Sequence, residues 1–379
     1  MEPAEAVRHF ERALAARPLE VALHHQLAVA HQQVLMADGA ESVLDAICAE
    51  LPAAFTSQLH RARLRELRGD TRGAAILYLR ALTTAQFRGF WCDEGSTPEW
   101  LRKAVIHAMD VAHAGRIALF QEWLDPLVAQ YGDDEMMRVA KCVAMHIGLA
   151  EPARPDPRQR PSFLYFPDLP VQPVFDRQAF ADELEAQTAQ IRAELMQVRA
   201  QSVPFHDHVP EARRDALTRG GSWDAYFFWR DGVRFDAHHA ACPATSAALA
   251  KLPLDVVPDR GPEVCFSIMQ PGAHILPHRG VTNTRAVFHL ALDIPEGCAL
   301  DLVGVRELAW REGASFVFDD TFEHQAWNRS DRPRAILLGD IWNPHLRPAE
   351  RSAIAALVPL LGDFARSTHP VLDAREPPA

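Results

Sequence analysis

Residues 267–294 read SIMQPGAHILPHRGVTNTRAVFHLALDI, and residues 315–346 read SFVFDDTFEHQAWNRSDRPRAILLGDIWNPHL. Short apolar runs in both stretches alternate with Gly, Pro, Asn and Asp, which is typical of β-strands joined by turns. His278 and His324 fall in the turn-like breaks, and Arg334 lies in the apolar run that follows His324. We expect a small β-barrel that brings two candidate metal ligands and one anion-binding arginine to the same mouth.

The chemistry of the two histidines is that of a metal site with one missing ligand. Neutral imidazole suits Fe, Cu, Ni and Zn, and non-haem Fe(II) oxygenases usually add a carboxylate to two histidines. That carboxylate normally lies two residues after the first histidine, where this chain has Gly280. Three explanations remain open: water completes the site, an anion binds there, or His278 and His324 are ordinary turn or surface residues.

A longer series of motifs resembles the aspartyl/asparaginyl β-hydroxylase family, whose barrels depend on Fe(II) and 2-oxoglutarate. The resemblance covers roughly residues 160–350. Upstream motifs are PSFLYFP at 161–167, GSW at 221–223 and CPAT at 242–245. The later motifs are Ser-Ile-Met-x-Pro-Gly at 267–272, His278-x-Gly-x-Thr-Asn with Arg285 and His289-Leu, Phe-Asp-Asp-x-Phe-Glu-His ending at His324, Trp327, Arg334, and Asp-Ile-Trp-x-Pro at 340–344.

The resemblance implies roles for individual residues. His278 and His324 are the implied iron ligands, and the family itself has glycine where this chain has Gly280. Arg334 is the implied partner of the distal carboxylate of 2-oxoglutarate, a task that suits its fork of donors. Ser267 would help to hold that carboxylate, Met269 would line the same pocket, and His289 would lie near the other end of the cosubstrate.

One position departs from the family pattern. Members that act on protein Asp or Asn carry a second arginine where this chain has Val287, although Arg285 is retained. Losing this cation makes an aspartyl substrate less certain, and Arg279 or Arg234 are candidates to compensate. We therefore name Arg285 and Arg234 as candidate substrate-binding residues. Asp319 and Asp320 are either partners that orient a histidine or turn residues.

The first ninety residues repeat with a helical period. Small and large apolar residues recur at intervals of 34 positions: Ala6, Phe10, Ala13 and Leu14, then Ala40, Leu44, Ile47 and Cys48, then Ala74, Tyr78, Ala81 and Leu82. This period indicates tetratricopeptide (TPR)-like repeats, and the alternative is an ordinary amphipathic helix bundle. Because such repeats form concave surfaces, we expect them to hold a peptide or protein substrate, with homodimerisation as the alternative role.

Composition divides the chain into parts. We expect a TPR-like domain at 1–150, a proline-rich linker at 151–161, a double-stranded β-helix (jelly-roll, cupin-like) oxygenase domain at 162–360 and a C-terminal tail at 361–379. Residues 177–200 predict one long helix at the start of the third part. A chain of 379 residues is long enough for two or three such domains.

Net charge and cysteine content limit the expected binding partners and cellular compartment. The net charge of −11 argues against nucleic acid or an anionic membrane as the main partner. No apolar run is long enough for a transmembrane helix, and the N-terminus reads as an amphipathic helix, not a signal peptide. The six cysteines form no CxxC pair. We therefore expect reduced thiols and a cytoplasmic protein.

These observations predict an Fe(II)-, 2-oxoglutarate- and O2-dependent dioxygenase that hydroxylates an sp3 carbon. The resemblance points to the β-carbon of Asp or Asn in a peptide or protein. Two alternatives are a non-catalytic TPR scaffold with a degenerate barrel, and an oxygenase or halogenase acting on a small molecule. The joint presence of His278, His324 and Arg334 argues against the scaffold.

Overall fold

The computed structural model describes residues 1–16, 20–205 and 217–370. The chain forms two compact units, one made of Met1–Pro126, Ile147–Leu149 and Leu360–Ala379, the other of Leu127–His146 and Ala150–Pro359. The predicted domain boundary at residue 150 follows the helix Asp133–His146. The division between the two units falls earlier, after Pro126, inside the helix Arg102–Tyr131. In the described part of the chain, no helix is long and apolar enough to cross a membrane.

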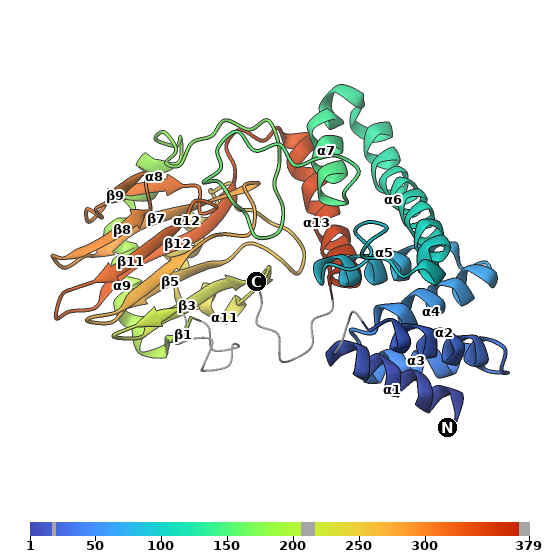
Figure 1. Ribbon diagram of the computed structural model, residues 1–379. Helices are drawn as coiled ribbons and strands as arrows, with labels where there is room; N and C mark the ends of the chain where they lie inside the picture. Colours follow the sequence, from blue (N-terminus) through green and yellow to red (C-terminus); the bar gives the residue numbers. More distant parts are fainter. Residues whose placement is uncertain (17–19, 206–216, 371–379) are drawn as a thin grey trace. The chain divides into compact units, whose positions relative to one another are not determined.

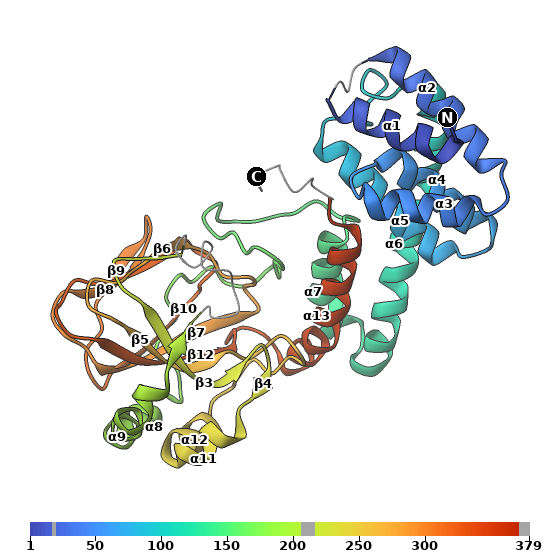
Figure 2. The same ribbon diagram turned by 90° about the horizontal axis from the view of Figure 1, so that it is seen from below.

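The N-terminal unit is helical, as Figure 2 shows in blue to cyan. Its elements are α1 (Pro3–Ala16), α2 (Val21–Leu35), α3 (Ala40–Glu50), α4 (Phe55–Leu67), α5 (Thr71–Phe87), η1 (Glu99–Leu101) and the first part of α6 (Arg102–Tyr131). The residues that recur every 34 positions lie on α1, α3 and α5, and Leu44, Ile47 and Tyr78 among them are buried in the helical core. A helical N-terminal region is therefore confirmed, while its assignment to TPR-like repeats stays a prediction.

The second unit contains two antiparallel sheets (Figure 1). Its strands are β1 (Val203–Pro204), β2 (Thr218–Arg219), β3 (Trp223–Arg230), β4 (Val233–Arg234), β5 (Val264–Met269), β6 (His274–His278), β7 (Arg285–Asp293), β8 (Cys298–Leu302), β9 (Arg306–Leu308), β10 (Ser315–Phe318), β11 (His324–Asn328) and β12 (Arg334–Trp342). Among the described residues, one sheet has the order β1-β3-β5-β12-β7-β10 with β4 beside β3, and the other has the order β2-β6-β11-β8-β9.

Residues alternate between the two faces of the larger sheet, as the period of a strand requires. Leu337 on β12 packs with Phe266 and Phe288 beneath helices α8 (Ala181–Ala186), α9 (Thr188–Val198) and α12 (Pro243–Leu249). A further short helix, α11 (Asp236–Ala241), lies between α9 and α12 in the chain. Ile336, its neighbour on β12, packs in a second core with Leu300 of the smaller sheet. The larger sheet is thus covered by helices on one face and by the smaller sheet on the other.

The helix expected at 177–200 is shorter and interrupted. It divides into α8 and α9 at Gln187, followed by η2 (Arg199–Gln201). The hydroxyl of Thr188 donates to the carbonyl of Glu185 at 2.6 Å, a local bond that competes with helical pairing at this point. The carboxylate of Glu185 meanwhile accepts from the backbone and hydroxyl of Ser315. Contacts with the sheet therefore fix where the helix breaks.

The proline-rich segment 151–161 has no helix or strand, but it is packed onto the β-unit. Gln159 is 3% exposed, and its side-chain amide donates to Asp319 at 2.6 Å. The amide of Arg160 donates to the carbonyl of Thr321. These side chains and backbone groups attach the segment to the turn before His324, so it is more than a spacer.

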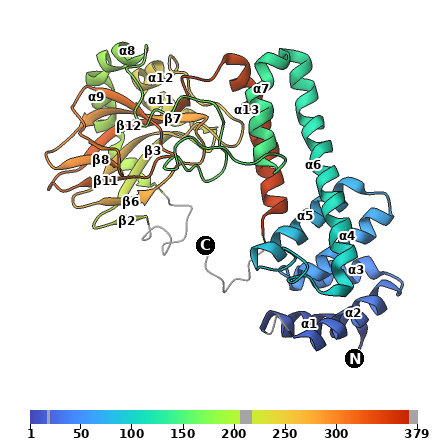
Figure 3. The ribbon, with the colours of Figure 1, turned by 45° about the horizontal axis from the view of Figure 1, so that its top comes forward.

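Two further helices complete the β-unit, α7 (Asp133–His146) and the N-terminal part of α13 (Pro348–Thr368), which Figure 3 shows side by side. The guanidinium of Arg138 on α7 donates to both carboxylate oxygens of Glu350 on α13, at 2.7 and 2.5 Å. The side chain of Glu350 is fully buried. Since α13 continues to Thr368, residues 361–368 of the predicted tail are helical, and residues 371–379 lie outside the described residues.

Candidate functional site

Two histidines face each other across neighbouring strands of the smaller sheet. His278 is the last residue of β6 and His324 the first of β11, and the antiparallel register places them directly opposite one another. Their ring centroids are 4.1 Å apart. Pairing of these two strands therefore explains how residues far apart in sequence come together.

Backbone contacts leave the same nitrogen free in both rings. The Nδ1 of His278 lies 2.8 Å from the carbonyl of Leu276, and the Nδ1 of His324 lies 3.0 Å from the carbonyl of Phe322. A carbonyl only accepts, so Nδ1 carries the proton and Nε2 keeps its lone pair. Burial lowers the pKa of both, and burial together with His278 lowers that of His324 to about 3. Both imidazoles are thus neutral and suited to a metal.

A cavity of about 230 Å³ opens between the two sheets at this point. Of the residues predicted from the sequence, it is lined by Ser267, His278, Arg285, His289, His324 and Arg334. The smaller sheet contributes the histidine pair. The larger sheet contributes the other four residues from the faces of β5, β7 and β12 that point away from the covering helices.

Arg334 is a buried cation without a carboxylate partner among the described residues. It is 1% exposed, its Nη1 lies 3.3 Å from the carbonyl and 3.4 Å from the hydroxyl of Ser267, and its Nε has no hydrogen-bond partner. Its guanidinium carbon lies 4.6 Å from the centre of the Trp310 ring. Burial lowers its pKa to about 10. An uncompensated buried charge is strongly unfavourable, so this arrangement calls for an anionic ligand.

His289 offers a second open nitrogen in the same part of the cavity. The indole of Trp310 donates to its Nδ1 at 3.2 Å, which leaves the proton on Nε2. This Nε2 is buried and has no partner in the part of the chain that the structure describes. Burial, and next the charge of Arg334, hold the pKa of His289 well below its usual range. A neutral donor thus lies near Arg334, as an oxo-acid ligand requires.

Residues 185–344 match the sequence profile of the aspartyl/asparaginyl β-hydroxylase family. This segment belongs to that family. The matched segment holds both histidines, Arg334 and both sheets, and the family resemblance expected from the motifs is confirmed.

Named relatives of this β-hydroxylase family differ in what they act on. Aspartate beta-hydroxylase domain-containing protein 2 of Rattus norvegicus is 32% identical over 52% of this chain and 58% of its own length. Human aspartyl/asparaginyl beta-hydroxylase is 37% identical over 37% of this chain and 18% of its own length. Ornithine lipid ester-linked acyl 2-hydroxylase of Rhizobium tropici is 34% identical over 47% of this chain and 63% of its own length. The chain thus spans less than two thirds of each.

Among the β-hydroxylase motif residues, Arg285 lines the cavity but is already neutralised. Its Nη1 donates to Asp340 at 2.7 Å, and its Nη2 lies 3.6 Å from a carboxylate oxygen of Asp320. Val287 follows two residues later on the same face of β7, opposite Asp340. The side chain at position 287 of the cavity wall is therefore apolar, where the sequence departs from the family pattern.

Three other predicted residues lie differently from what the sequence suggested. Met269 is on the cavity-side face of β5 but is fully buried in the core between the sheets, so it does not line the cavity. Arg234 lies on β4, pairs with Asp236 and is not among the residues that line the cavity. Arg279 does line the cavity, where it pairs with Glu323 at 3.0 Å. Arg234 is thus withdrawn as a substrate-binding candidate.

Gly280 has no room for any side chain. A Cβ built at this position would lie 2.1 Å from the carboxyl carbon of Asp320, whose own carbonyl accepts from the amide of Gly280 at 2.7 Å. Asp320 therefore fills the space that a carboxylate at 280 would need. Asp319, by contrast, accepts from the backbone and hydroxyl of Thr321 and acts as a turn residue.

We expect Gly280→Ala to destabilise the protein by about 1–3 kcal/mol, because the new methyl group overlaps a buried carboxylate that must move. Urea unfolding would measure the loss. Gly95→Ala is the matched control, since its nearest contact would be at 3.4 Å. Combining Gly280→Ala with Asp320→Ala should cost less than the sum of the two single changes. Strict additivity would show that the two positions do not compete for space.

The residues fit Fe(II) bound by two histidines. Within the described residues, no group of three or more His, Cys, Asp and Glu is arranged to hold a metal. The two backbone-locked rings nevertheless present Nε2 atoms to one cavity that also holds Arg334 and His289. A ligand that binds Arg334 through one carboxylate and the metal through its other end would complete the coordination.

Two residues of the cavity lining escaped the sequence reasoning, Glu263 and Trp310. Glu263 was detectable in principle, because it precedes Ser267 by two strand periods and must share its face. Trp310 lies outside the named strands, and only the folded chain brings it against His289 and Arg334. No sequence signal marked it.

Proposed function

We propose that this chain is an Fe(II)- and 2-oxoglutarate-dependent dioxygenase with a double-stranded β-helix, and that it hydroxylates an sp3 carbon. The observation that carries the proposal is Arg334, a buried guanidinium without a carboxylate partner in the described chain, in the same cavity as two neutral histidines. Arginine can bind a carboxylate bidentately, through two parallel hydrogen bonds, and the hydroxyl of Ser267 lies beside Arg334.

The cavity residues have separate tasks in this reaction. His278 and His324 would hold Fe(II), which together with 2-oxoglutarate and O2 supplies the chemistry that converts C–H to C–OH. Arg334 and Ser267 would bind the distal carboxylate of 2-oxoglutarate, and His289 would donate from Nε2. The apolar side chains of Val287, Ile336, Leu338 and Phe318 exclude water from the reacting centre.

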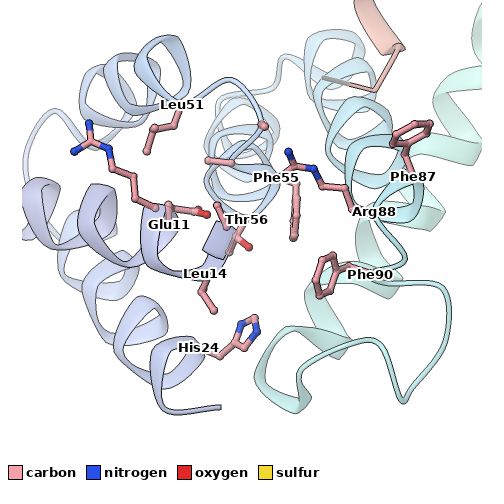
Figure 4. A pocket seen from close by; sticks show the side chains of 13 residues that line it. Glu11, Leu14, His24, Leu51, Phe55, Thr56, Phe87, Arg88 and Phe90 are labelled. Atoms are coloured by element: carbon pink, nitrogen blue, oxygen red, sulfur yellow. The ribbon is translucent and has the colours of Figure 1, made fainter. Parts of the chain in front are cut away.

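The finer part of the proposal concerns the substrate. The resemblance predicts the β-carbon of Asp or Asn in a peptide or protein, and we propose that the helical unit holds that partner. A cavity of about 500 Å³ supports this role; it is lined by Leu14, Leu51, Phe55, Phe87 and Phe90 beside Glu11 (Figure 4). Burial raises the pKa of Glu11 to about 7. Homodimerisation through the repeats stays the alternative prediction.

The test is an anaerobic titration with Fe(II) and 2-oxoglutarate, followed by O2 and mass spectrometry of Asp- and Asn-containing peptides and free amino acids. We expect stoichiometric 2-oxoglutarate binding, Fe(II)-dependent succinate formation and the gain of one oxygen atom by a substrate. Absence of 2-oxoglutarate binding with Fe(II) present would contradict the proposal.

A further inference from the structure

Three adjacent strands carry polar residues at both ends of the cavity. At one end lie Ser267, Arg334 and His289, the proposed cosubstrate residues. Four residues earlier in the chain than Ser267, Glu263 also lines the cavity, about 13 Å away along an extended strand. Asp340 on β12 and Arg285 on β7 lie at that same end. Apolar side chains separate the two ends.

The end marked by Glu263 has more carboxylates than cations. We define the acidic end of the cavity by four side chains, Asp255, Glu263, Asp320 and Asp340. Two arginines oppose them: Arg285 bonds Asp340 at 2.7 Å and lies 3.6 Å from Asp320, and the charge of Arg230 acts on Glu263. These four carboxylates therefore outnumber the two guanidinium groups at this end of the cavity.

Two of the carboxylates that line the cavity have oxygens that no group in the described part of the chain satisfies. Asp320 is 6% exposed and lines the cavity, and its Oδ1 has no hydrogen-bond partner in the described chain. Glu263 is half-buried in the lining, and its side chain makes no hydrogen bond or ion pair with the described residues. An orphaned buried oxygen and a cavity-facing carboxylate both indicate a ligand that donates.

Titration behaviour agrees with a surplus of negative charge. Burial, and next the neighbouring Asp340, raise the pKa of Glu263 to about 8. Burial raises the pKa of Asp255 to about 7, although Arg285 opposes the shift. A cation at this end would favour the ionised carboxylates, whereas an anion would add to the repulsion.

We propose that the acidic end binds a protonated primary amine of the substrate, with Glu263 as the residue that determines this specificity. The inference rests on the proposed function, whose substrate it narrows. A substrate carboxylate would face Glu263 and Asp340, and the guanidinium of Arg285 beside them is already bonded to Asp340. A divalent cation is a poorer fit, since the described residues offer no group of three ligands in metal-binding geometry.

The test compares three probes of similar size, n-butylammonium, n-butanol and n-butyrate. Their dissociation constants would be measured by ligand-detected NMR with the metal-free full chain, and again with Zn(II) and 2-oxoglutarate present. When Zn(II) and 2-oxoglutarate are present, we expect n-butylammonium to bind at least about tenfold more tightly than n-butyrate, as one charge-assisted hydrogen bond implies. Without 2-oxoglutarate, n-butyrate can also bind at Arg334, so the comparison in its presence decides. Equal affinities, or a preference for n-butyrate, would overturn the inference.

Substitutions test whether Glu263 causes the preference for n-butylammonium. Glu263→Gln should weaken n-butylammonium binding about tenfold and leave n-butanol binding unchanged, because only the charge is lost. Glu263→Asp, which keeps the charge, should retain the preference for the ammonium ion. Glu307→Gln, on exposed β9, is the control and should bind all three probes as the wild type does. An unchanged preference in Glu263→Gln would remove Glu263 from the site.

The two proposals fail separately. If n-butylammonium is preferred but 2-oxoglutarate does not bind in the presence of metal, the acidic end stands and the dioxygenase assignment falls. If 2-oxoglutarate binds through Arg334 and n-butylammonium shows no preference, the dioxygenase assignment stands and the amine-binding inference falls.

Discussion

Replacing either His278 or His324 by alanine should abolish Fe(II)-dependent turnover of 2-oxoglutarate. We propose these two histidines as the metal ligands that the described residues supply, so either change leaves one of them. Altering groups that merely orient a ligand typically costs ten- to hundredfold in metal affinity, and losing the ligand itself should cost at least about a hundredfold. Succinate formation and anaerobic Fe(II) titration would measure the two effects independently.

His274→Ala is the control for both variants. His274 lies on the same strand as His278, but its ring bonds the side chain of Gln325 and does not line the cavity. Circular dichroism should show that all three variants keep their fold. Near-wild-type succinate formation by His278→Ala or His324→Ala would show that the histidine concerned is not a ligand.

Arg334→Leu should raise the concentration of 2-oxoglutarate needed for half-saturation by about ten- to a hundredfold. This loss corresponds to removing charge-assisted hydrogen bonds worth about 1.5–3 kcal/mol. The free energy of unfolding of the ligand-free protein should rise or stay unchanged, because leucine removes a buried charge that has no carboxylate partner among the described residues. Isothermal titration and urea unfolding would measure the two quantities.

Arg332→Leu provides the comparison. Arg332 lies two residues before Arg334, is exposed, and pairs with Asp293 outside the cavity. It should leave 2-oxoglutarate affinity unchanged. If Arg334→Leu bound 2-oxoglutarate normally but unfolded more easily, Arg334 would be a structural residue.

The strand pattern and the histidine pair were accessible from the sequence for a physical reason. Strand residues alternate with a period of two, and antiparallel pairing brings the end of one strand to the beginning of its neighbour. His278 and His324 occupy such positions, so their approach followed from local signals. Ser267, Arg334 and His289 were predicted from the family resemblance, and the structure places all three in the cavity lining.

What the sequence missed depends on contacts between distant segments. Met269 shares the face of Ser267, yet it is buried in the core between the sheets. No local sequence pattern indicates that burial. The exclusion at Gly280 depends on Asp320, forty residues later in the chain. The continuation of α13 to Thr368 was missed because the tail was assigned from its terminal prolines alone, although Pro359 lies inside the helix.

The pairing of Arg138 with Glu350 bears on how the catalytic part of the chain can be isolated. A fragment that starts at the proline-rich segment would lack α7 and strip Glu350 of the guanidinium that binds both its oxygens. Arg347 would remain beside that carboxylate, but the surface covered by α7, including the contact of Cys142 with the carbonyl of Tyr165, would open to water. A soluble fragment that contains both sheets should therefore begin before Asp133, and helix α7 is to be counted as part of the fold of the β-unit.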